Sequence, residues 1–222
     1  MSLDLTRRQL LKVAAAAAAA WRAAPWVVRT PAAFAQTLPG DPTTVSTLEA
    51  YADTLIPGEK RSPTDRAIAG AAPGGGAVQA GAIEMMNFPT AGTGPALPAL
   101  AAAINARATQ YAGQNGIVLD PTVPPLVSLD FAQRTTLLVE LLDVTTGDEQ
   151  LAYFALAGIV FIAYHTAGFL HTTDALATGH PGLVAIRFPQ PDVDGKWRFP
   201  EFSYRRELAA KHPLTTRRGS PR

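Results

Sequence analysis

Apolar positions recur at helical spacing along most of this chain. The clearest case is residues 45–56, where one helical face carries Leu48, Tyr51, Ala52, Leu55 and Ile56. A repeat of three to four residues predicts an amphipathic α-helix. Pro57-Gly58 follows directly and predicts where this helix ends.

Four further segments are also predicted to be helical. Helices are expected over 76–88 and 97–114, then from Ser128 with Asp130 in the first turn, and over 151–170. Ser128 is a candidate N-cap, because its side chain can accept a hydrogen bond from the first turn of a helix. Residues 58–75 contain many Gly and Pro residues and predict a long loop.

The segment 151–170 is the longest apolar stretch, with no Asp, Glu, Lys or Arg in twenty residues. That length would allow a membrane span. Neither end has the basic flank typical of such spans, and the stretch contains His165. A helix that is apolar all round can also be the central helix of a bundle, and the pattern favours this interpretation.

The last third of the chain is different. Its apolar runs are short, and Asp194-Gly195 between two of them is typical of a tight hairpin turn. The whole pattern predicts a mostly α protein. We expect one helical-bundle domain over residues 36–222, with about five helices and a small irregular or β-hairpin C-terminal segment.

The first 35 residues have the three zones of an export signal peptide. A charged start is followed by a weakly apolar run over 13–20, and Ala33-Phe34-Ala35 predicts cleavage after Ala35. The charged start contains Arg7-Arg8 in the frame TRRQLLK, which matches the twin-arginine (Tat) pattern. We therefore expect the Tat translocon as a partner, membrane contact only during export, and an extracellular or periplasmic location.

Composition narrows the chemistry. The segment 36–222 has 14 Lys and Arg against 17 Asp and Glu, so no basic excess indicates nucleic acid. The chain has no cysteine, which excludes disulfides, iron–sulfur clusters and a thiol nucleophile. Neither a dinucleotide-binding glycine motif nor a phosphate-binding loop is present. No cofactor of its own is expected.

One group of histidines could bind a metal. His171 and Asp174 are three residues apart and can share a helical face, and the turn at His180 could return a third ligand. This set, His171/Asp174/His180, is the alternative hypothesis of an exported metal-dependent enzyme. In the other interpretation His165 is buried against a carbonyl and His171 lies at a helix end.

Two C-terminal patterns have alternatives. Residues 190–201 align partly with a calcium-binding loop, but Gln190 replaces its first aspartate and nearby prolines favour a turn. The aromatic group that follows could pack on the protein's own core or form an interface, in which aromatic residues and arginine are enriched. This candidate interface consists of Trp197, Phe199, Phe202, Tyr204 and Arg205.

The segment 47–58, TLEAYADTLIPG, resembles the start of the mature part of the gluconate 2-dehydrogenase subunit 3 family. In that family a Tat leader precedes a helix that ends in A-D-T-L-I-P. The resemblance implies a small helical companion of a flavin-dependent oxidoreductase of the glucose–methanol–choline (GMC) class. The small subunit would carry the export signal, while the larger subunit would hold the FAD and perform the reaction. The motif contains no catalytic residue.

The leader and the resemblance together predict the function. We expect a non-catalytic small subunit that binds a larger flavoprotein in the cytoplasm and takes it through the Tat translocon. The metal-dependent enzyme remains the alternative.

Overall fold

A central helix packed on several sides organises the computed structural model, which describes residues 41–89, 93–143, 147–168 and 170–191. The described residues are mostly helical and contain no strand, in agreement with the predicted fold class. In chain order the helices are α2 (Pro42–Leu55), α3 (Ala82–Met86), the 3₁₀ helix η3 (Gly94–Ala96), α4 (Leu97–Gln114), α5 (Pro125–Ser128), α6 (Phe131–Asp143), α7 (Asp148–Thr166), α8 (Thr172–Ala177) and α9 (Pro181–Ala185).

The chain divides into two compact units, and every helix named above belongs to the first, which ends at Ile186. Of the five helices expected from the sequence, four correspond to α2, α4, α6 and α7, and the helix expected over 76–88 is shortened to α3, because residues 77–81 form turns. Three short α-helices, α5, α8 and α9, and the 3₁₀ helix η3 were not predicted. The expected hairpin at Asp194-Gly195 lies outside the described residues.

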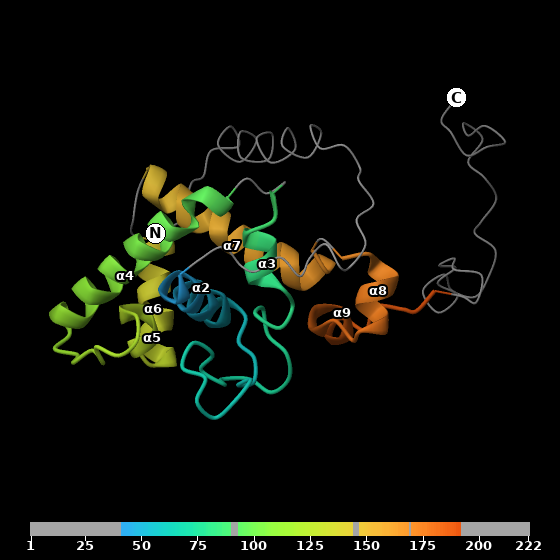
Figure 1. Ribbon diagram of the computed structural model, residues 1–222, viewed down its shortest axis with the longest axis horizontal. Helices are drawn as coiled ribbons and strands as arrows, with labels where there is room; N and C mark the ends of the chain where they lie inside the picture. The colour runs from blue at the N-terminus through green and yellow to red at the C-terminus, as the bar shows by residue number, and fades with distance from the viewer. Residues whose placement is uncertain (1–40, 90–92, 144–146, 169, 192–222) are drawn as a thin grey trace. The chain divides into compact units, whose positions relative to one another are not determined.

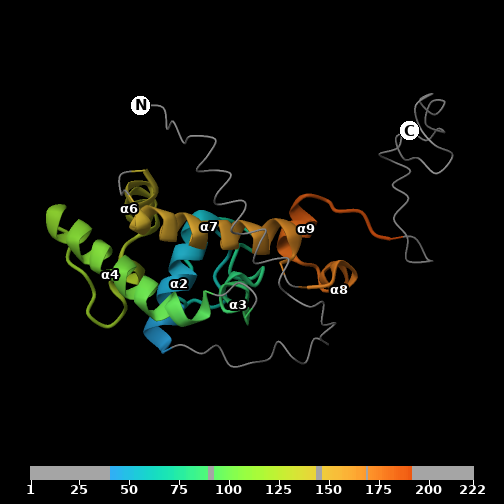
Figure 2. The ribbon, with the colours of Figure 1, turned by 90° about the horizontal axis from the view of Figure 1, so that it is seen from above.

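The central helix is α2, which contacts α3, α4, α5, α6 and α7 (Figures 1 and 2). It is buried on nearly all sides, although its sequence predicts a single apolar face. Its threonines explain this difference, because their hydroxyls bond to carbonyls one turn back: Thr47 to Thr43 at 2.7 Å and Thr54 to Ala50 at 2.6 Å. A threonine whose hydroxyl is satisfied within the helix can be buried at low cost.

The apolar helix α7 is not the fully buried helix that its sequence favours. One face packs into the core through Tyr153, Leu156 and Val160, while Phe154 and Phe161 on the other face are 41% and 44% exposed. Within the described residues no helix is both long and apolar enough to cross a membrane. α7 is therefore a core helix with one exposed apolar face.

The start of α6 also differs from the expected cap. Asp130 is the capping residue: its carboxylate accepts from Gln133 N at 2.9 Å, and the Gln133 side chain accepts from Asp130 N at 2.9 Å. This reciprocal pair is a capping box. Ser128 instead ends α5, and its hydroxyl accepts a hydrogen bond from the backbone of Asp120 at 2.7 Å.

Candidate functional site: a loop held by buried charges

Asp53 ties together the two ends of the long loop that follows α2. Its side chain is buried in the last turn of that helix. One carboxylate oxygen accepts from Gly58 N at 3.1 Å and the other from Ala69 N at 2.8 Å. Burial raises the pKa of Asp53, and these two hydrogen bonds oppose the rise. Asp53, the acidic residue of the A-D-T-L-I-P segment, therefore holds the backbone at the two ends of the loop.

Arg134 holds the same loop from α6. It is 3% exposed, and its guanidinium donates five hydrogen bonds, all to backbone carbonyls. The acceptors are Leu126 at 3.1 Å, Leu129 at 2.9 Å, Val127 at 2.7 Å, Ala67 at 2.6 Å and Arg66 at 2.9 Å. The planar fork of donors suits this role. One side chain thus joins the loop at 66–67 to α5 and the residue that follows it.

The charges of Arg134 and Asp53 influence each other across this buried centre. Burial lowers the pKa of Arg134, and the negative charge of Asp53 opposes that change. In turn the positive charge of Arg134 favours the ionised form of Asp53. Two buried groups of opposite charge are each less costly to bury together than alone.

A second set of charges fixes the first half of the loop. Arg61 reaches Glu49 of α2 through two hydrogen bonds of 2.5 and 2.8 Å, and it reaches Asp65 at 2.7 Å. Asp65 also accepts from Ala67 N and Ile68 N, both at 3.1 Å. Burial alone would raise the pKa of Asp65, but these hydrogen bonds outweigh it and the pKa is lowered.

The two chain segments at the base of the loop, residues 56–59 and 74–77, approach each other so closely that glycine is needed there. A Cβ built on Gly76 would lie 2.6 Å from Gly58 N and 2.6 Å from the carbonyl oxygen of Ile56. The loop is closed by backbone hydrogen bonds from Glu59 N to the Gly74 carbonyl at 2.7 Å and from Ala77 N to the Ile56 carbonyl at 3.0 Å. Side chains larger than hydrogen would push these two segments apart.

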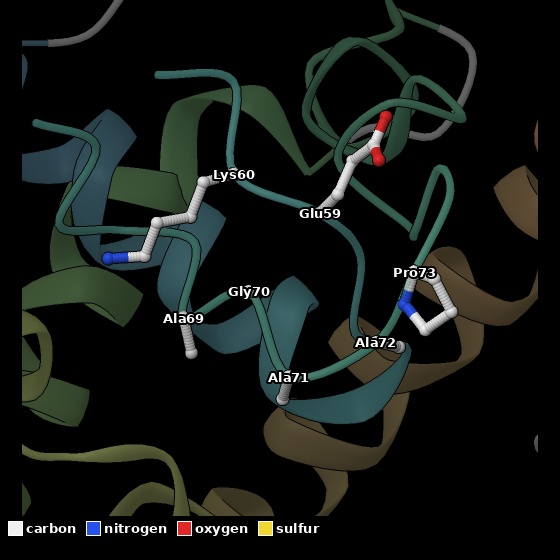
Figure 3. Close-up of a pocket in the computed structure, with 7 residues that line it drawn as sticks. All are labelled: Glu59, Lys60, Ala69, Gly70, Ala71, Ala72 and Pro73. Carbon is white, nitrogen blue, oxygen red and sulfur yellow. The ribbon is translucent and has the colours of Figure 1, made fainter. Parts of the chain in front are cut away.

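The outer side of the loop carries an open cavity of about 420 Å³. Figure 3 shows Glu59 and Lys60 beside it, with their charged ends pointing away from each other. The rest of the lining is small and backbone-rich: Ala69, Gly70, Ala71, Ala72 and Pro73. The loop therefore presents exposed backbone and two opposite charges on a fixed inner framework.

The structure does not assemble the predicted metal set. Among the described residues, which include all three candidates, no group of three His, Asp or Glu side chains could hold a metal ion. His171 is the N-cap of α8, and its ring accepts from Thr173 N at 3.4 Å. Asp174 is exposed in the first turn of α8. The turn at His180 does not return a ligand to them.

His180 is instead buried between two parts of the fold. It is 4% exposed, and its Nε2 donates to the carbonyl of Ala80 at 3.1 Å. Burial lowers the pKa of His180, while the carbonyls of Ala80 and Ala163 oppose this more weakly. It therefore links the start of α9 to the segment before α3.

His165 was expected to be buried, but it is exposed on α7. Its ring stacks on Phe161 with centroids 6.2 Å apart and meets Tyr164 edge-on at 5.3 Å. Its polar atoms need no buried carbonyl because water can reach them.

Other predicted residues lie outside the described part of the chain. These are the Tat motif Arg7-Arg8 with the cleavage site after Ala35, most of the partial calcium loop 190–201, and the candidate interface Trp197, Phe199, Phe202, Tyr204 and Arg205.

Sequence reasoning missed Arg134, although a clue was present. Arg134 has the spacing of a core position, because the buried face of α6 comprises Arg134, Leu137, Leu138 and Leu141. An arginine in register with an apolar stripe indicates a buried charge with partners elsewhere. The role of Asp53 could not be read from the pattern, since its partners depend on how the loop folds back.

Together, the fold and this site define a small helical domain with a rigid, exposed loop. The chain belongs to DUF5987, a family of unknown function, whose model matches residues 42–222. No curated protein and no solved structure matches the chain.

Proposed function

We propose that this protein is a non-catalytic small subunit that binds a larger flavoprotein oxidoreductase and carries it through the Tat pathway. The observation that carries the proposal is the loop over 57–76, which is irregular and exposed outside but fixed inside by Asp53 and Arg134. Ordered loops of more than about 15 residues are uncommon in small domains and usually serve a function.

The buried charges around this loop favour recognition over catalysis. Both carboxylate oxygens of Asp53 and every guanidinium nitrogen of Arg134 are engaged with backbone. A catalytic acid or base needs a proton-accepting or proton-donating atom that faces its substrate. Their hydrogen bonds instead hold the backbone of the loop in one conformation, which preorganises its outer surface for a partner.

The identity of the partner rests on the resemblance of residues 47–58 to the gluconate 2-dehydrogenase subunit 3 family. A larger subunit of the GMC class would hold FAD, and the Tat leader would export both chains after folding. Lys60 and Glu59 at the cavity would contact that subunit.

The test is a pull-down of the tagged full-length chain from its native host, with an absorbance spectrum of the eluate. We expect a larger chain with flavin absorbance. The Lys60→Glu variant should retain on the order of tenfold less of the larger chain, because a reversed charge is repelled by a partner surface complementary to Lys60. Gln110→Glu, on the outer face of α4, is the matched control. An eluate without flavin, or equal losses in both variants, would contradict the proposal.

A second experiment tests export. Replacing both Arg7 and Arg8 with lysine should leave the flavoprotein in the cytoplasm together with this chain. Normal export of the flavoprotein from such cells would show that it does not depend on this subunit.

A further inference from the structure

The end of helix α4 contains an asparagine followed directly by a glycine, Asn115-Gly116. Asn115 is the C-cap of α4, and Gly116 follows it with a φ of +64°, a left-handed conformation that favours glycine. The chain has two other asparagines, Asn87 and Asn105, and neither precedes a glycine. The shape of the helix end therefore brings together a pair that occurs nowhere else in the sequence.

An asparagine before glycine can react with the backbone that follows it. The backbone nitrogen of Gly116 attacks Cγ of Asn115, the bond from Cγ to Nδ2 breaks, and ammonia leaves with the proton that the attacking nitrogen gives up. Water then opens the resulting succinimide at either of its carbonyls and produces aspartate or isoaspartate at position 115. Glycine favours this ring closure, because it has no side chain to hinder the attacking nitrogen or to restrict the backbone.

The attacking nitrogen is free and accessible in the structure. Every residue from Gly113 to Gly116 is exposed. No described residue accepts a hydrogen bond from the backbone nitrogen of Gly116, whereas Ile117 N, the next along the chain, donates to the Ala112 carbonyl at 2.9 Å. A Cβ built on Gly116 would have no atom within 4 Å. Water therefore reaches the group that reacts.

The helix end slows the reaction but does not block it. Asn115 Nδ2 donates to the Tyr111 carbonyl at 2.8 Å, and a ψ of 6° at Asn115 points the Gly116 nitrogen away from Cγ. Ring closure requires rotation about this bond, and the rotation breaks the hydrogen bond of Ile117 N. The ends of helices open at low cost, so we expect the rate to follow the opening of the last turn of α4.

We propose that Asn115 is a site of self-modification, at which the folded chain converts its own asparagine into aspartate or isoaspartate when the last turn of α4 opens. The reaction consumes only water, so it does not depend on the proposed flavoprotein. Asn105 is protected inside α4, where its Nδ2 donates to Thr47 at 2.9 Å and its Oδ1 accepts from Leu126 N at 3.1 Å.

The products fit the end of α4 less well than asparagine does. A carboxylate only accepts hydrogen bonds, so the bond to the Tyr111 carbonyl is lost. The new negative charge lies at the negative end of the helix dipole, and the last turn of α4 has no basic residue to offset it. Isoaspartate also lengthens the backbone and displaces Ile117 from the Ala112 carbonyl. Because Ile117 and Leu119 pack against the core, the modification loosens the segment after α4.

Peptide mapping by mass spectrometry tests the proposal on the full-length chain, incubated in water enriched in heavy oxygen. Asn115 should gain heavy oxygen at least about tenfold faster than Asn87 and Asn105, the controls in the same sample. The rate should rise with pH, because the deprotonated nitrogen is the nucleophile. Gly113→Ala, whose side chain enters open space, stabilises the last turn of α4 and should slow the reaction about two- to fivefold.

The Asn115→Asp variant contains one product and measures its effect on the fold. Gln114→Glu is the matched control, because it adds the same charge in the last turn and keeps the Asn115 amide. Asn115→Asp should melt about 1–6 °C below this control, since it loses the hydrogen bond to Tyr111. A folded chain in which Asn115 reacts no faster than Asn87 and Asn105 would overturn the proposal. An unchanged rate in Gly113→Ala would overturn the role of helix opening.

Discussion

The loop over 57–76 and helix α7 differ in a way that their secondary structure does not suggest. The loop has no regular secondary structure, yet its backbone is fixed from within by Asp53, Arg134 and Arg61. α7 is a regular helix of 19 residues, yet one face has large apolar side chains exposed. Buried charges can thus define an irregular surface, whereas a well-formed helix can leave one apolar face uncovered by the described residues.

The largest expected effect comes from removing the charge that holds the loop. Arg134→Met should lower the free energy of unfolding by about 3–5 kcal/mol, because five carbonyls lose their donor and Asp53 loses a neighbouring positive charge. Denaturant unfolding measures this change.

Arg66→Met is the matched control for that variant. Arg66 is exposed and pairs with Asp120 at 3.1 Å on the surface. Surface ion pairs contribute about 0–1 kcal/mol. If Arg134→Met were as mild as the control, the loop would be held by its apolar contacts and the comparison would fail.

Apolar patterning predicts some of these features and conceals others. The long helices α2, α4 and α6 follow from the spacing of apolar residues, α7 follows from a continuous apolar run, and the end of α2 follows from Pro57-Gly58. The central position of α2 could not be predicted, because its threonines satisfy their hydroxyls within the helix and so conceal its burial. Hydropathy instead favoured α7, whose exposed apolar face has the same residue types as a core.

The candidate site was harder to predict than the fold. The hydrogen bonds of Arg134 span up to 68 positions along the sequence, so helical periodicity contains no information about them. The metal prediction relied on the shared helical face of His171 and Asp174 and on a turn at His180 that would return a third ligand. The structure separates its residues because His171 caps α8 while His180 faces Ala80.

The next effect concerns the base of the loop. Gly76→Ala should destabilise the fold by about 1–3 kcal/mol, since its Cβ would overlap backbone atoms of Gly58 and Ile56, which cannot rotate away. Thermal unfolding measures it, and Gly113→Ala provides the comparison. Equal melting temperatures for the two variants would show that the chain segments around Gly58 and Gly76 can move apart without loss of stability.

A smaller effect should appear as a dependence on pH. The pKa of His180 is lowered below its usual 6.5 by burial, so the unfolded chain takes up a proton that the folded chain does not. The stability contributed by neutral His180 is thus fully present above pH 6.5 and is lost as the pH falls through the folded pKa. Each unit of depression corresponds to about 1.4 kcal/mol.

Denaturant unfolding between about pH 7.5 and pH 5.5 checks this dependence, because carboxylates titrate mainly below that window. His180→Gln should flatten the slope. A natural chain whose stability does not change across this window would contradict the buried neutral state of His180.

The smallest effect concerns Gly158 in the middle of α7. Gly158→Ala should raise the stability of the protein by about 0.5–1 kcal/mol, or roughly 1–4 °C in melting temperature, because alanine restricts the unfolded chain and meets no atom in the fold. Gly113→Ala should do the same on α4. Thermal unfolding measures both changes, and a Gly158→Ala variant less stable than the natural chain would show that this glycine has a packing role in the fold.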